Sequence, residues 1–143
     1  MSFENAPLRF FPTPYPDEIF YSVLCRYHAR GGNPSVYQTN RELWGKNIGK
    51  SLLLPSGIEY LAKRLPSQAG LTSERFIAEN TVYPFLKPFI LRERDEVLFE
   101  AMKNGTTGRT NLHNLSGFSR LRFTRQLYLR YCTQCMREDR PGR

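Results

Sequence analysis

The amino-acid sequence predicts a mainly α-helical protein: a compact helical domain over residues 16–105, then a short β and zinc-knuckle segment at the C-terminal end. Three observations support this prediction. Apolar residues recur at helical spacing in several stretches before residue 105, and Pro or Gly stands at the ends of most of them. Residues that favour strands gather only in 121–131. A chain of 143 residues can bury a sizeable core as one domain.

Residues 1–15 are expected to form an extended arm, because prolines 7, 12, 14 and 16 disfavour helical backbone. The aromatic residues Phe10, Phe11 and Tyr15 in this arm either cover the core or contact a partner, and the sequence weighs the two equally. The first helix is expected to open at 16–18, where Asp17 and Glu18 would face the positive end of the helix dipole. The glycines at 31 and 32 should end it.

Four further helices are expected from caps and apolar spacing, over about 34–44, 55–65, 72–80 and 91–103. Residues 83–89 contain two prolines, so we predict an apolar connector packed on the core. Residues 106–143 are predicted to hold a linker and the first part of a zinc-binding module, with loop composition over 104–120 and a strand or hairpin arm over 121–131.

The positive charge lies near the C-terminal end of the chain. Residues 1–100 contain 12 Lys and Arg against 11 Asp and Glu, whereas residues 101–143 contain 9 against 2. A basic segment beside a neutral body is typical of a polyanionic partner such as double-stranded DNA. A solvated basic segment without a partner explains the composition equally well.

Cys132 and Cys135 are the sharpest chemical feature, because two thiolates three residues apart can bind one tetrahedral zinc. A structural zinc needs four ligands, and a second pair is expected beyond residue 143. A redox role would need a βαβ pattern, which is missing. Cys25 is expected to be an inert, half-buried thiol and His28 a surface or capping residue. No nucleophile–base set or phosphate-binding loop occurs, so no catalytic residue and no enzyme activity is predicted.

Four arginines alternate with aromatic residues near the C-terminal end: Arg120, Arg122, Arg125 and Arg130. Their guanidinium groups suit DNA phosphates. The null hypothesis is that the aromatics face the core and the arginines face water. The second and third helices could also form a helix-turn-helix, which would present Lys63 and Arg64 to a DNA groove.

Four stretches taken in order resemble one known family. They are FPTPYPDEIFYS at 11–22, LPS at 54–56, NTVYPFLKPF at 80–89 and RYCTQC at 130–135. Together they are similar to the N-terminal region of the TnsD/TniQ family of transposon target-site selection proteins. Asn80 stands where the family's HTLxPLYxPF-type segment usually has histidine, so that histidine's role does not transfer.

The resemblance implies a bacterial, cytoplasmic, nucleoid-associated adaptor without enzymatic activity. Such an adaptor binds a chosen DNA site, or a complex bound there, and recruits an AAA+ ATPase regulator of transposition (TnsC-like). It also implies zinc as a ligand, with no membrane and no small-molecule substrate. The alternatives are a zinc-finger or helix-turn-helix transcription regulator without an ATPase partner, and a small redox enzyme that uses Cys132 and Cys135.

Overall fold

The computed structural model describes residues 6–45, 53–66, 70–106, 112–118 and 133–138. In this part of the chain every regular element is helical, which confirms the mainly α-helical part of the predicted fold class but not its short β and zinc-knuckle segment. The helices in order are α1 (Phe20–Gly31), α2 (Val36–Trp44), α3 (Ile58–Ala62), α4 (Ser73–Glu79), α5 (Tyr83–Leu86), the 3-10 turn η3 (Lys87–Phe89), α6 (Arg92–Asn104), α7 (Leu112–Leu115) and α8 (Thr133–Glu138).

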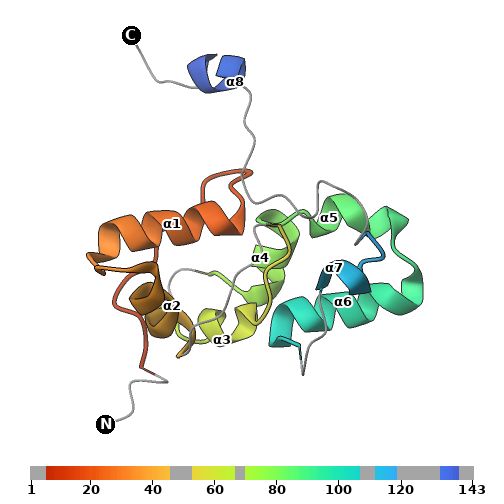
Figure 1. Cartoon of the computed structure of the whole chain (residues 1–143), viewed down its shortest axis with the longest axis horizontal. Helices are drawn as coiled ribbons and strands as arrows, with labels where there is room; N and C mark the ends of the chain where they lie inside the picture. Colours follow the sequence, from red (N-terminus) through yellow and green to blue (C-terminus); the bar gives the residue numbers. More distant parts are fainter. Residues whose placement is uncertain (1–5, 46–52, 67–69, 107–111, 119–132, 139–143) are drawn as a thin grey trace.

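The body is built around α4 (Figure 1). In that view α1, α2 and α3 lie on one side of α4, and α5, α6 and α7 lie on the other. α4 packs on α3, α5 and α6, and α6 also packs on α3 and α7. The core between these helices is apolar and includes the fully buried Phe20, Leu43, Ile58, Phe76 and Leu98.

Local sequence explains where several helices begin and end. The Ser35 hydroxyl accepts a hydrogen bond from the Gln38 N–H, and the Thr72 hydroxyl accepts one from the Arg75 N–H, so both caps start their helices as predicted. Gly45 ends α2 with a φ of 68°, a left-handed conformation that costs glycine little, and its N–H donates to the Arg41 carbonyl.

The predicted start of the first helix is wrong by a few residues. α1 begins at Phe20, because Asp17 has a φ of 57° and the backbone turns there before it enters the helix. No carboxylate lies in the first turn of α1. Glu18 uses its carboxylate for the arm instead, as described below.

The apolar connector predicted over 83–89 consists of two short helical turns. The segment forms α5 and η3, because each of its prolines occupies a first-turn position, where the missing N–H costs no hydrogen bond. The predicted loop over 104–120 likewise contains α7. The strand expected over 121–131 lies outside the described residues.

Arg64 is buried, so the prediction that it faces a DNA groove is wrong. Its guanidinium donates to the carbonyls of Ala6, Glu42 and Leu43, at 2.9 Å for Ala6 and 3.1 Å for Leu43. Its own carbonyl accepts the N–H of Leu8 at 2.7 Å. One side chain therefore joins the arm, the C-terminal turn of α2 and the end of α3. α3 has only five residues, and the buried position of Arg64 does not support a helix-turn-helix motif.

Replacing this guanidinium should destabilise the whole body. We expect Arg64→Met to lower the free energy of unfolding by about 2–4 kcal/mol, because three buried or partly buried hydrogen bonds from a charged donor are lost. Urea unfolding followed by circular dichroism measures the change. The matched control is Lys63→Met, since Lys63 is exposed and its ammonium lies 3.4 Å from the Glu59 carboxylate at the surface; it should change stability by less than about 0.5 kcal/mol. Equal effects of the two substitutions would contradict the role given to Arg64.

Candidate functional site

The candidate site lies where the N-terminal arm meets α1, and Glu18 is its centre. The Glu18 side chain is only 8% exposed. Its carboxylate accepts hydrogen bonds from the Tyr15 N–H at 2.9 Å, the Ser22 hydroxyl at 2.7 Å and the Arg26 Nε at 2.9 Å. Burial raises the pKa of Glu18, but these hydrogen bonds outweigh it, so the net pKa lies below its usual value. The Glu18 carboxylate is therefore charged, and its hydrogen bonds join the arm to α1.

Arg26 extends this network to the arm. Its guanidinium donates to the Thr13 carbonyl at 2.8 Å and lies 4.1 Å from the centre of the Tyr15 ring. That distance suits a cation–π contact. Tyr15 is nevertheless 57% exposed, so the network holds an aromatic side chain in a fixed position at the surface.

Asn80 joins the arm junction to the segment that leads into α5. It is buried, and its side-chain amide donates to the Glu18 carbonyl at 2.6 Å. Its own carbonyl accepts the Phe20 N–H at 2.6 Å. Phe20 is the first residue of α1, so Asn80 also satisfies one of the N–H groups that a helix leaves free there. The residue that departs from the family pattern thus has a structural role in this chain.

The three arm aromatics have different surroundings. Phe11 is partly buried and packs on the core, with ring centres 5.7 Å from Tyr27 and 6.0 Å from Phe76. Phe10 stacks on Tyr27 at 4.9 Å but remains exposed along with Tyr15. Phe11 therefore covers the core, whereas Phe10 and Tyr15 are exposed at the surface. Partner binding by all three stays a prediction.

A second group of exposed apolar side chains was missed by sequence analysis. Phe85 and Phe89 are each 70% exposed and Leu91 is 65% exposed; we call these three residues the 85–91 patch. The ring centres of Phe85 and Phe89 are 6.4 Å apart. The expectation that this segment packs on the core holds only for Tyr83 and Leu86, which are buried. The spacing of four between Phe85 and Phe89, out of phase with Tyr83 and Leu86, was the available signal.

The turns beneath the patch are held firmly. The Tyr83 hydroxyl donates to an Asp95 carboxylate oxygen at 2.6 Å, and the Lys87 ammonium lies 3.8 Å from the other oxygen. Burial and the hydrogen bond to Asp95 raise the pKa of Tyr83, so the phenol stays protonated as a donor. The patch therefore stands on a rigid base rather than on a free loop.

The remaining predicted site residues are mostly outside the described part of the chain. This applies to Cys132 and to the four arginines Arg120, Arg122, Arg125 and Arg130. Cys135 lies in α8, a helix where a strand end was expected. Cys25 is exposed rather than half-buried. His28 is partly buried, and its Nδ1 is 2.7 Å from the Thr39 hydroxyl, so it joins α1 to α2 rather than standing alone at the surface.

Among the described residues, no group of three or more His, Cys, Asp or Glu side chains could hold a metal ion. None of the helices in those ranges has the length and apolar character that crossing a bilayer requires.

Comparison with known proteins gives two findings. The family model of TniQ matches residues 9–143. The Escherichia coli protein described as "Transposon Tn7 transposition protein TnsD" is 28% identical over 130 residues, which is 90% of this chain. The chain spans about a quarter of the length of that relative, since the match covers 25% of it. The matched range includes the whole arm junction and the 85–91 patch.

The Glu18 network should make stability depend on pH. Because the pKa of folded Glu18 is depressed, its contribution is present above the unfolded value of about 4.3 and is lost as the pH falls through the folded value. We expect Glu18→Gln to cost about 1–2 kcal/mol at pH 7 and to reduce the loss of stability below pH 4. The free energy of unfolding at several pH values measures both effects.

Glu79→Gln is the matched control, because Glu79 forms an exposed pair with Arg75 on α4. It should leave stability and its pH dependence nearly unchanged. A Glu18→Gln protein with an unaltered pH profile would show that Glu18 is not held in its charged form.

Proposed function

The chain belongs to the TniQ family, and from that membership we propose that it acts in DNA transposition as a target-site selection adaptor. In this proposal the protein has no catalytic residue of its own. It binds DNA, or a complex already bound to the target, and recruits an AAA+ ATPase regulator of transposition. The single observation that supports the recruiting role is the presence of large apolar side chains held in fixed positions at the surface of the matched domain.

The ATPase regulator would bind at the 85–91 patch and at the exposed arm aromatics Phe10 and Tyr15. Aromatic side chains that are exposed in the free protein and become buried in a complex are the usual source of binding energy at interfaces. Here they cost little entropy to order, because Arg26 already positions Tyr15 and the Tyr83–Asp95 hydrogen bond already fixes the turn. Asn80 connects the two groups through the backbone of Glu18.

Removing the patch should weaken recruitment without unfolding the chain. We expect the double variant Phe85→Ala, Phe89→Ala to lower affinity for the ATPase regulator by at least about tenfold, in line with the loss of interface hot spots. Pull-down and surface-plasmon resonance with the purified regulator measure the change.

The double variant Val36→Ala, Tyr37→Ala is the matched control, because both side chains are exposed at the start of α2. It should bind the regulator normally. If the α2 variant loses binding and the patch variant keeps it, the interface has been assigned to the wrong face.

DNA would be bound by the basic C-terminal segment, with Arg120, Arg122, Arg125 and Arg130 at phosphates. We expect DNA affinity to fall with salt, and the double variant Arg122→Ala, Arg125→Ala to reduce the log–log slope by about two. The control is Lys63→Ala with Arg75→Ala, two cations paired with carboxylates on their own helices. An unchanged slope in the first variant, measured by fluorescence anisotropy, would rule out these contacts.

Cys132 and Cys135 are proposed to bind zinc. They would supply two of the four thiolate or imidazole ligands of a structural site. Such a site would stabilise the C-terminal segment when filled. Metal analysis of the natural protein purified without chelator should then give one zinc per chain. Cys132→Ser should abolish it and leave the helical body folded, whereas absence of zinc from the unmutated protein would refute the site.

A further inference from the structure

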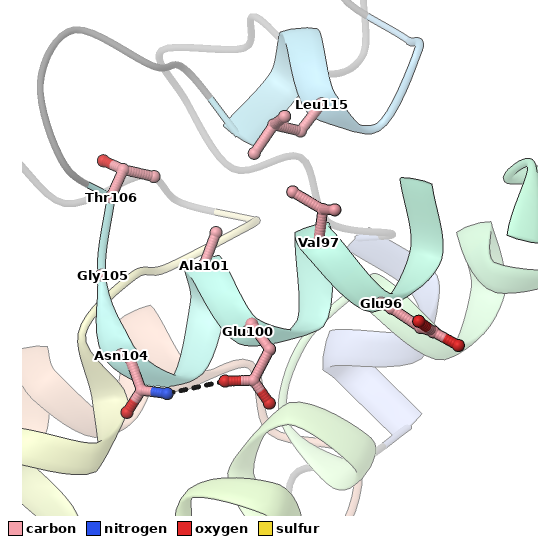
Figure 2. Close-up of a pocket in the computed structure, with 8 residues that line it drawn as sticks. All are labelled: Glu96, Val97, Glu100, Ala101, Asn104, Gly105, Thr106 and Leu115. Carbon is pink, nitrogen blue, oxygen red and sulfur yellow. Dashed lines mark hydrogen bonds between the residues drawn. The ribbon is translucent and has the colours of Figure 1, made fainter. Parts of the chain in front are cut away.

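We propose that a groove between α6 and α7 binds a basic amphipathic helix of a protein partner. The groove has a volume of about 590 Å³. Figure 2 shows Val97 and Ala101 directed from α6 toward Leu115 of α7, with Glu96, Glu100 and Asn104 on the other side of α6 in that view. Glu96 and Glu100 nevertheless line the groove together with Val97 and Ala101, so acidic residues adjoin the apolar wall along α6. This site goes beyond the proposed adaptor function and does not depend on it.

The apolar wall is accessible. Val97 is 52% exposed in the middle of α6, a helix whose other face is fully buried through Leu98 and Met102. Leu115 is partly buried and forms the facing edge of the groove. The exposed Val97 side chain and the accessible part of Leu115 have apolar surface that a partner could remove from water.

The acidic margin indicates the charge of the occupant. Glu96 and Glu100 are both exposed, and the described part of the chain places no cation within ion-pair distance of either. Glu100 instead accepts a hydrogen bond from the Asn104 amide at 2.7 Å, which orders its carboxylate. No Lys or Arg is among the described residues that line the groove, so the two carboxylates give it a negative charge on a chain whose net charge is +8. They would repel nucleic acid and attract a cationic side-chain row.

The length of the groove sets the length of the ligand. Glu96 and Asn104 are eight residues apart on one helix, which corresponds to about 12 Å. A partner helix of two to three turns would place apolar residues at i, i+3, i+4 and i+7 on the wall and Lys or Arg on the adjoining row. The occupant is thus a cationic amphipathic segment of about 8–12 residues.

Binding of a designed peptide to the full 143-residue chain tests the proposal. The probe is a peptide of about 14 residues with Leu at i, i+3, i+4 and i+7 and Lys on the adjoining row. Its counterpart has Glu in place of every Lys. We expect the Lys peptide to bind in a titration calorimeter, with affinity falling as salt rises, and the Glu peptide not to bind. Equal binding of both peptides, or of neither, would overturn the proposal.

Matched variants locate the peptide. Glu96→Gln with Glu100→Gln should weaken the Lys peptide by about three- to tenfold, whereas Glu93→Gln, on the same helix but outside the groove, should not. Val97→Ser should weaken binding of the Lys peptide. Val36 is also exposed but lies on α2, so Val36→Ser should leave binding unchanged. Binding that ignores the groove variants would refute the site. So would a concentration-dependent dimer that Val97→Ser dissociates, because the groove would then be occupied by a second copy.

Discussion

The fold depends on the buried guanidinium of Arg64. The last carbonyls of a helix have no partner within it and carry the negative end of the dipole, and Arg64 donates to two of them, Glu42 and Leu43, at the end of α2. The same fork reaches Ala6 in the arm. Lysine has no planar fork and could not serve three carbonyls in this geometry. This one side chain links the arm, α2 and the end of α3 beside the buried Leu8.

The described part of the arm, from residue 6 onward, is therefore held at both ends. Arg64 fixes its beginning at Ala6 and Leu8, and the network of Glu18, Arg26 and Asn80 fixes its end. Between these anchors Phe11 faces the core, and Phe10 and Tyr15 remain at the surface. Fixed ends explain how a proline-rich segment without regular structure can present aromatic side chains in defined positions. Pre-ordering of this kind lowers the entropy cost of binding.

Much of the fold could be predicted from the sequence because its helices carry local signals. The caps at Ser35 and Thr72 and the glycine after α2 depend on a few neighbouring residues, and all three are confirmed. The errors have a different origin. Glu18 has the chemistry of a first-turn carboxylate, but Arg26 binds that carboxylate in a tertiary network and Asn80 binds the Glu18 backbone carbonyl. No local pattern reveals these contacts. An arginine near the end of a helix is a typical DNA contact. Arg64 is buried instead, because the arm, α2 and the end of α3 pack together around it.

The same reasoning explains why the candidate site was only partly predictable. The Pro84 and Pro88 pattern correctly excluded a long helix but not two successive short turns, whose period turns Tyr83 and Leu86 inward and Phe85 and Phe89 outward. The Tyr83–Asp95 hydrogen bond favours this phase, because it would be lost if Tyr83 turned outward. The exposure of the two phenylalanines is thus a consequence of a satisfied hydrogen bond beneath them. Apolar surface kept outward by such a constraint is left exposed in the described part of the chain, and in the proposed function the partner covers it.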